Sequence, residues 1–191
     1  YTSDQGFYLG EHGWFYKRYI YNESFKTPLL VRWPNTIKPG ISNEEMVQNL
    51  DFAKTLLEAA QITAPDDMQG ESLMPLLTSH EKKWKRDAVY YHYYEYPAVH
   101  QVKRHYGIVT KEFKLIHFYY DVNEWELYDR KKDPLEINNV YAQPEYEEEI
   151  TLLKTKLEGL RNQYGDSDEL NQHYINIHLK NQIDSPLKGK D

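Results

Sequence analysis

Residues 106–120 read YGIVTKEFKLIHFYY and consist of two apolar runs on either side of a polar pair. The runs Tyr106–Thr110 and Lys114–Tyr120 are rich in the β-branched and aromatic residues that are typical of strands. The pair Lys111-Glu112 predicts a tight hairpin between them. We therefore expect two neighbouring antiparallel strands in this part of the chain.

The sequence on either side of the hairpin extends this sheet. Ala88–Tyr96 and Glu126–Asp129 are further β-rich runs bounded by turn-like residues. Residues 145–164 place Ile150, Leu153, Leu157 and Leu160 at helical spacing, which predicts an amphipathic helix lying on the sheet. We expect a four-stranded antiparallel α+β subdomain with a packed helix over residues 81–165, followed by a peripheral polar tail over 166–191.

Residues 1–80 have a different pattern. Tyr1 to about Asn22 is a glycine-punctuated aromatic stretch without a period, which indicates an ordered loop. The apolar run Leu29–Trp33 predicts a buried strand, and the spacing of apolar residues predicts a helix over about 49–61. Gly70–Leu77 is interpreted as a single packed turn. Together these features indicate an α/β architecture.

Composition excludes several classes of protein. The chain has 191 residues, no cysteine and a formal net charge of -7, so thiolate chemistry is absent and phosphate-binding basic surfaces are not expected. No stretch reaches the roughly 18 to 20 apolar residues of a membrane span. We therefore expect no nucleic-acid partner and no membrane span. The 18 tyrosines are compatible with strand packing or with sugar-binding clefts.

The stretch with most chemical information is residues 3–18, SDQGFYLGEHGWFYKR. Asp4 and Gln5 place a carboxylate beside a side-chain carbonyl, and Gly6 follows in a turn. Two adjacent oxygens of this kind suit a hard divalent cation. Turns also favour Asp and Gly for backbone reasons, so these residues alone do not decide between a metal site and an ordinary turn.

This stretch resembles the signature of the type I sulfatases, members of the alkaline-phosphatase-like superfamily, in which Asp-(Asn/His/Gln)-Gly precedes Leu-Gly-Glu-His-Gly and a lysine. The resemblance continues in family order along the chain, although Lys26 stands where the family usually has arginine. It covers the segments 21–34 (YNESFKTPLLVRWP), 70–77 (GESLMPLL), 106–116 and 126–136 (ELYDRKKDPLE).

The resemblance implies a sulfuric ester hydrolase, with residues 1–80 as the C-terminal part of the catalytic domain and the edge of its sheet. Asp4 and Gln5 would be calcium ligands, and Lys17 would contact the sulfate. A cation and a lysine can both stabilise an anionic ester without transferring a proton. The family's Cys/Ser-x-Pro-x-Arg motif, whose Cys or Ser becomes the formylglycine nucleophile, is not found. We therefore expect this chain to need the N-terminal part of the same enzyme and to be inactive alone.

Substrate and location are expected from overall likeness. The region 92–106 resembles that of hexosamine and glycosaminoglycan sulfatases, so a sulfated sugar such as N-acetylglucosamine 6-sulfate is the expected substrate. His100 and Arg104 are candidates for sugar hydroxyl contacts, and a solvated charged loop is an equal alternative. His12 is either a rim residue or a packed histidine. The family implies a periplasmic or secreted enzyme, although the first residues of this chain show no signal sequence.

Two other functions remain open. A phosphate mono- or diester hydrolase of the same superfamily is the enzymatic alternative, and the Leu-Gly-Glu-His-Gly run with its following lysine favours sulfate instead. A noncatalytic carbohydrate-binding or oligomerisation module is the alternative outside enzymes, with the tyrosine- and tryptophan-rich clefts as its basis.

Overall fold

The computed structural model describes residues 1–78, 84–98 and 100–184, and for 181–184 only the backbone. The chain forms two compact units. One contains residues 1–4 and 27–89, and the other contains residues 5–26 and 90–191. The loop that carries the sulfatase-like signature therefore belongs, from Gln5 onward, to the same unit as the predicted sheet. The boundaries at residues 80 and 165 stay a prediction.

The predicted sheet is present in the second unit. Its strands are β3 (Ala88–Tyr93), β4 (His105–Thr110), β5 (Phe113–Phe118) and β6 (Glu124–Asp129), in the order β3-β4-β5-β6. β4 and β5 pair antiparallel with Val109 opposite Lys114, which places Lys111-Glu112 in the predicted hairpin. β5 and β6 are also antiparallel, with Leu115 opposite Leu127. The predicted antiparallel sheet is confirmed.

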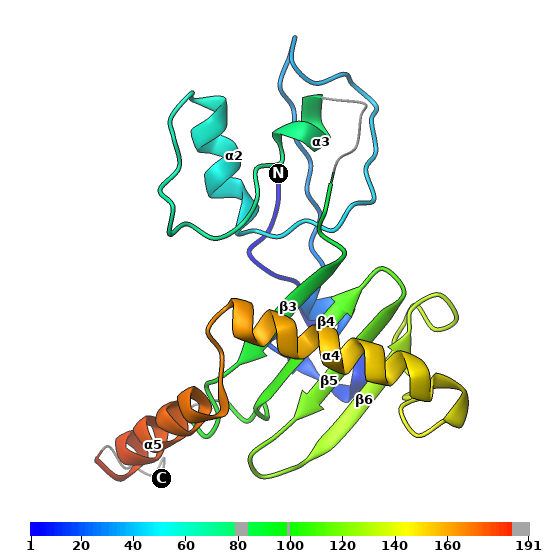
Figure 1. The fold of residues 1–191 in the computed structure, drawn as a ribbon, viewed down its shortest axis with the longest axis vertical. Helices are drawn as coiled ribbons and strands as arrows, with labels where there is room; N and C mark the ends of the chain where they lie inside the picture. Colours follow the sequence, from blue (N-terminus) through cyan, green and yellow to red (C-terminus); the bar gives the residue numbers. More distant parts are fainter. Residues whose placement is uncertain (79–83, 99, 185–191) are drawn as a thin grey trace. The chain divides into compact units, whose positions relative to one another are not determined.

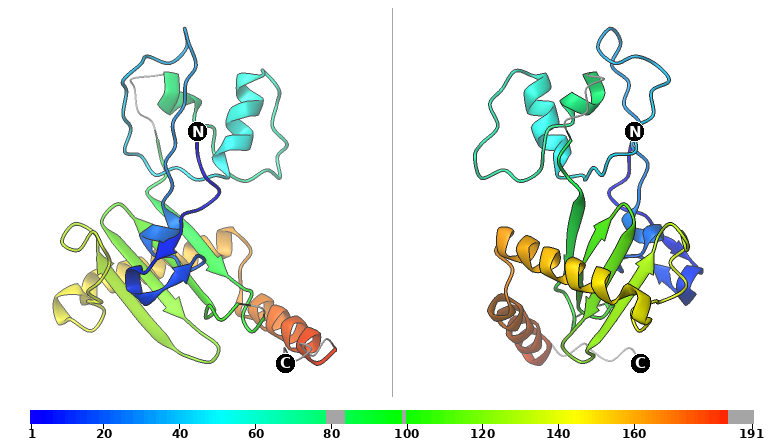
Figure 2. Two further views of the ribbon diagram at one scale, coloured as in Figure 1. Left: turned by 180° about the vertical axis from the view of Figure 1, so that it is seen from behind. Right: turned by 45° about the vertical axis from the view of Figure 1, so that its right-hand side comes forward.

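The sheet is covered on both faces, which explains why nearly all of β4 is buried. Helix α4 (Glu147–Gln163) lies across one face, and residues 5–26 lie against the other, as Figures 1 and 2 show from opposite sides. Alternation along β4 decides which side chain faces which layer. The ring of Tyr106 contacts the Arg161 guanidinium of α4, whereas His105 stacks on Tyr19 of the loop.

Helix α4 confirms the amphipathic helix predicted over 145–164. It follows a 3-10 turn at Pro144–Tyr146, and Leu153 and Leu157 are buried as its spacing required. Asp166, just beyond the helix, ties the helix end to the sheet. Its carboxylate accepts hydrogen bonds from Tyr94 at 3.0 Å and Arg161 at 2.9 Å, and also from Tyr90.

The structure adds one element to the predicted fold. Residues 166–191, expected as a polar tail, contain helix α5 (Asp168–Asp184). Its few apolar groups left no periodic signal in the sequence, yet Ile175 is buried and Tyr94 contacts the ring of Tyr174 at 5.1 Å. Within the described ranges, no helix combines the length and the apolar character that crossing a lipid bilayer requires.

The first unit is built around helix α2 (Asp51–Ala59) and the short helix α3 (Met74–Thr78). Helix α2 lies within the helix predicted over about 49–61, and α3 occupies the second half of the turn predicted over Gly70–Leu77. Asp51 is fully buried at the start of α2. Its two oxygens accept a bidentate pair of hydrogen bonds from Arg86 at 2.6 and 2.7 Å, and Glu71 N donates to it at 2.8 Å. One carboxylate therefore joins the helix start, the turn before α3 and the approach to β3.

The run Leu29–Trp33 differs from the buried strand that its composition predicts. Within the described residues it makes an isolated bridge, between Leu29 and Thr2, and Tyr1 and Leu30 exchange hydrogen bonds. Leu30 is 64% exposed and Val31 is 44% exposed. A strand requires neighbours along its whole length, and among the described residues 1–78 and 84–89 a bridge partner lies only at the Leu29 end of the run.

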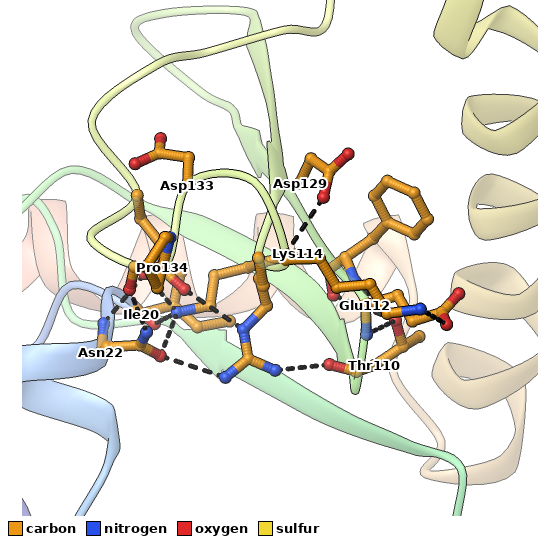
Figure 3. Close-up of polar contacts among 12 residues, drawn as sticks. Ile20, Asn22, Thr110, Glu112, Lys114, Asp129, Asp133 and Pro134 are labelled. Atoms are coloured by element: carbon orange, nitrogen blue, oxygen red, sulfur yellow. Dashed lines mark hydrogen bonds and ion pairs between the residues drawn. The ribbon is translucent and has the colours of Figure 1, made fainter.

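A buried ion pair fixes the loop to the sheet. Lys114 on β5 has no exposed side-chain surface, and its ammonium donates to Glu136 Oε2 at 2.6 Å, Ile20 O at 2.8 Å and Asn22 Oδ1 at 3.2 Å (Figure 3). Asn22, at the start of the short helix α1 (Asn22–Phe25), donates its backbone N–H to the same Glu136 oxygen at 3.0 Å. The loop carbonyl of Ile20 thus receives a charged donor from the sheet.

Candidate functional site

Residues 5–26 form a compact loop that contains the hairpin β1 (Tyr8–Leu9) and β2 (Phe15–Tyr16). The two strands pair antiparallel, with Tyr8 opposite Tyr16, and a 3-10 turn over Glu11–Gly13 joins them. Tyr8 is fully buried, and its hydroxyl donates to the carbonyl of Tyr19 at 3.1 Å. The conformation of the signature loop is therefore set by its own side chains and by the sheet beneath it.

Gly6 marks a close approach of the two ends of this loop. Its N–H donates to Ser24 O at 2.8 Å, and a Cβ at this position would lie 1.9 Å from the carbonyl oxygen of Glu23. Any other residue would displace one of the two segments. Glycine after the Asp4-Gln5 pair is thus required by packing, beyond its preference for turns.

Lys17 lies directly after β2 with a half-buried side chain. Both of its neighbours have left-handed backbone angles, with φ of 83° at Tyr16 and 101° at Arg18. Such conformations cost about 1–3 kcal/mol each for residues other than glycine and persist only where surrounding contacts impose them. The contacts at Arg18 are a hydrogen bond from its N–H to Ser24 Oγ at 2.9 Å and one from the Tyr91 hydroxyl to its carbonyl at 2.6 Å.

The Tyr91 hydroxyl keeps its proton in this arrangement. Burial raises the pKa of Tyr91 to about 12, and the nearby Arg18 opposes that rise only in part. Tyr91 therefore stays a donor to the Arg18 carbonyl at neutral pH. Because β3 carries Tyr91, the sheet holds the backbone on the C-terminal side of Lys17 in place.

His12 is held by two contacts within the loop. Its Nε2 lies 3.2 Å from Glu23 Oε2, and its ring stacks on Tyr21 with centroids 4.5 Å apart. Its own backbone is left-handed, with φ of 54°. These contacts place His12 as a packed residue of the loop, and a substrate contact by it stays a prediction.

His100 comes to the signature loop from the segment between β3 and β4. The Arg18 guanidinium lies 2.7 Å from His100 Nε2, and its Nε lies 3.8 Å from Glu95 Oε2. The structure thus brings His100 to Arg18, the residue after Lys17. Lys17 and His100 were predicted from the sequence. Arg18 gave no sequence signal of its own, because its partner lies 82 positions away.

Arg104, the other predicted sugar contact, is fully buried. Its guanidinium donates to Tyr96 O, to the Tyr119 hydroxyl at 3.5 Å, and to His178 Nδ1 of α5 at 3.0 Å. These bonds direct the guanidinium to groups of this chain. A sugar contact by Arg104 stays a prediction.

The candidate calcium ligands lie at the start of the chain. Asp4 is exposed and accepts a hydrogen bond from Ser3 Oγ at 3.3 Å, and Gln5 is half-buried. Their oxygens fit calcium in kind, but calcium takes six to eight oxygen ligands. Among the residues that the structure describes, no group of three or more His, Cys, Asp or Glu side chains could hold a metal ion.

Comparison with known proteins identifies the family. The model of the family described as N-sulphoglucosamine sulphohydrolase, C-terminal, matches residues 10–163. The chain belongs to the sulfatase family. This sulfatase chain is 52% identical over 171 residues to an N-acetylglucosamine-6-O-sulfatase of Bacteroides thetaiotaomicron. The alignment covers 88% of the chain and 30% of the relative. An arylsulfatase of Clostridium perfringens is 32% identical over 181 residues, covering 91% of the chain and 36% of the relative.

Solved structures agree with this assignment. A solved structure of a protein in complex with its substrate D-glucosamine-2-N,6-O-disulfate superposes with a TM-score of 0.82 at 52% identity, covering 88% of this chain and 34% of that one. A phosphonate monoester hydrolase of Agrobacterium radiobacter superposes with a TM-score of 0.72 at 26% identity, covering 85% of this chain and 34% of that one. The predicted family and the alkaline-phosphatase-like fold class are confirmed. The sulfatase chain spans about a third of the length of the relatives it matches.

Proposed function

We propose that this sulfatase chain acts as the C-terminal part of an enzyme that hydrolyses a sulfate ester on an amino sugar, such as N-acetylglucosamine 6-sulfate or a glycosaminoglycan unit. The observation that carries the proposal is the presentation of Lys17, half-buried between two left-handed residues in a loop anchored to the sheet. The identity to an N-acetylglucosamine-6-O-sulfatase supports the sugar.

Lys17 would bind the sulfate group. A sulfate monoester is an anion, and more negative charge develops on the ester oxygen as the bond to sulfur breaks. A fixed ammonium stabilises that charge best when little reorganisation is needed. The strained conformations on both sides of Lys17 support a rigid presentation of this kind.

The preceding part of the same enzyme would complete the site. It would supply the formylglycine nucleophile and the remaining calcium ligands, and Asp4 and Gln5 would add two oxygens to that calcium. The bound ion would supply positive charge beside the sulfate. His100, with Arg104 and His12, would lie on the sugar side.

A periplasmic or secreted location is part of this proposal. One relative, 35% identical over 83 residues, is named an extracellular sulfatase homolog of Drosophila melanogaster. Expression of the full-length enzyme, followed by cell fractionation, tests the location.

Replacement of Lys17 tests the function. In the full-length enzyme, Lys17→Ala should lower kcat for a sulfated aryl ester by about a hundredfold or more, the usual effect of losing one charge-stabilising donor. The exposed Lys38 offers a matched control, since Lys38→Ala removes the same group far along the chain from the loop. Turnover unchanged by Lys17→Ala would remove Lys17 from the site.

The likeness to a phosphonate monoester hydrolase makes hydrolysis of a phosphorus ester the second candidate reaction. Comparison of kcat/KM for matched sulfate, phosphate and phosphonate esters decides between them, and a preference for a phosphorus ester would overturn the sulfatase proposal. A noncatalytic module predicts that this chain binds unsulfated sugars without calcium. Calorimetry with sulfated and unsulfated sugars tests that alternative.

A further inference from the structure

The contact between Arg18 and His100 determines which nitrogen of the histidine carries its proton. A guanidinium has only donors, so at a separation of 2.7 Å the His100 Nε2 must be the acceptor. An imidazole that accepts at Nε2 is neutral and carries its proton on Nδ1. Protonation of Nε2 would bring two N–H groups together and break the contact.

The guanidinium is held on both sides. Its Nε faces Glu95 Oε2 at 3.8 Å, and the Tyr93 hydroxyl fixes that carboxylate at 2.8 Å. The Arg18 side chain is 21% exposed, so the surrounding chain restricts its rotamers. At the backbone, Ser24 and Tyr91 bind the Arg18 N–H and carbonyl. Arg18 is thus fixed at both ends of its side chain.

We propose that Arg18 is a positioning residue that sets the Nδ1–H tautomer and the ring orientation of His100, so that His100 offers an N–H donor to an acceptor oxygen of the sulfated sugar. The inference rests on the proposed function and extends it to Arg18, which follows the lysine that ends the family motif. Because Arg18 follows Lys17 directly, the backbone that presents the sulfate-binding lysine also carries the group that orients the sugar-binding histidine.

A structural bridge between two loops would also account for the contact, and the tautomer distinguishes the two roles. Nitrogen-15 spectra of the full-length enzyme, labelled in its histidine rings, separate protonated from unprotonated ring nitrogens. His100→Gln assigns the signals. We expect an unprotonated Nε2 and a protonated Nδ1 at His100 in the wild type, and loss of this tautomer in Arg18→Met. A wild-type His100 that is protonated on Nε2 would overturn the inference.

Arg18→Met is a suitable change because it keeps an unbranched apolar stem and removes every side-chain donor. Methionine meets the same left-handed backbone as arginine at this position, so the backbone strain is not altered. The bonds from the Arg18 N–H and to its carbonyl use only the main chain and remain available.

A double-mutant cycle tests whether Arg18 acts through His100. With a sulfated amino sugar as substrate, Arg18→Met and His100→Ala should each raise KM about tenfold, the equivalent of one lost hydrogen bond, with kcat little changed. The double variant should match His100→Ala alone. If the increases in KM of the two single variants multiply in the double variant, or if kcat falls without a rise in KM, the inference is overturned. Lys38→Met, at an exposed cation outside the segments that resemble the family, is the control.

Failure of the proposed function and failure of the Arg18 inference give different experimental results. If the wild-type enzyme turns over no sulfate ester, the proposed function falls and the role of the Nδ1–H donor falls with it, whatever tautomer the spectra show. If the enzyme is a sulfatase and its His100 lacks the predicted tautomer, the proposed function stands and Arg18 loses the positioning role.

Discussion

Replacement of Lys114 by methionine tests how the signature loop is held. The change removes the ammonium that donates to Ile20 O and to Glu136, and it leaves the Glu136 carboxylate fully buried. Breaking a buried ion pair from one side costs about 3–5 kcal/mol. Asn22 N at 3.0 Å and Arg130 Nε at 3.5 Å remain near that carboxylate, so we expect a loss at the lower end, about 3 kcal/mol.

Urea unfolding at pH 7 measures this loss as a fall in the midpoint with an unchanged slope. Burial lowers the pKa of Lys114 to about 8, against the opposing influence of Glu136, so the ammonium is still charged at this pH. Hydrogen exchange should accelerate most in residues 5–26, because their anchor is lost.

The double variant Lys114→Met/Glu136→Gln is the matched control. Removing both charges leaves no buried ion without a partner, so it should be more stable than Lys114→Met by about 1–2 kcal/mol. A loss below about 1 kcal/mol for Lys114→Met, or a double variant less stable than the single one, would refute the role of this pair.

Three further changes test other parts of the fold. Burial lowers the pKa of His105 to about 4, below its unfolded value. The protein should therefore lose about 3 kcal/mol of stability as the pH falls from about 6.5 toward 4, because only the unfolded chain takes up the proton. In His105→Phe the free energy of unfolding should depend less steeply on pH, and an unchanged slope would contradict this. Asp51→Asn leaves Arg86 without its buried partner and should cost about 3–5 kcal/mol in urea unfolding, whereas substitution of an exposed aspartate should cost little. Gly6→Ala forces the segment at Glu23 to move and should cost about 1–3 kcal/mol, and a thermal midpoint equal to that of the wild type would show that the close approach is not rigid.

Local patterns predicted the elements that carry strong periodicity. The hairpin at Lys111-Glu112, the strands beside it and helix α4 all follow from side-chain alternation or helical spacing. Helix α5 escaped prediction because its contacts, such as the one between Arg104 and His178, stabilise a helix without an apolar stripe. For Leu29–Trp33 the error was the reverse, because a strand was predicted where the structure has only an isolated bridge. Composition favours a strand there but does not show whether hydrogen-bonding neighbours are present.

Local sequence patterns contain only part of the candidate site. Lys17 and the Asp4-Gln5 pair lie in one contiguous motif, so their relation could be seen in the sequence. Arg18 acts on His100 across 82 positions, and no local pattern contains both residues. Burial of Arg104 was equally hidden, because a charged residue at the start of a strand is usually exposed.

The order of the two units along the chain has a consequence for synthesis and folding. Residues 27–89 interrupt the unit formed by 5–26 and 90–191, so the signature loop leaves the ribosome long before β5 can receive it. The bond from Lys114 to Ile20 closes a separation of 94 positions. Closing so long a loop is costly in entropy, and early folding of residues 27–89 would shorten the flexible path between its ends. An intervening unit that folds early would therefore lower the entropic cost of docking the loop that carries Lys17.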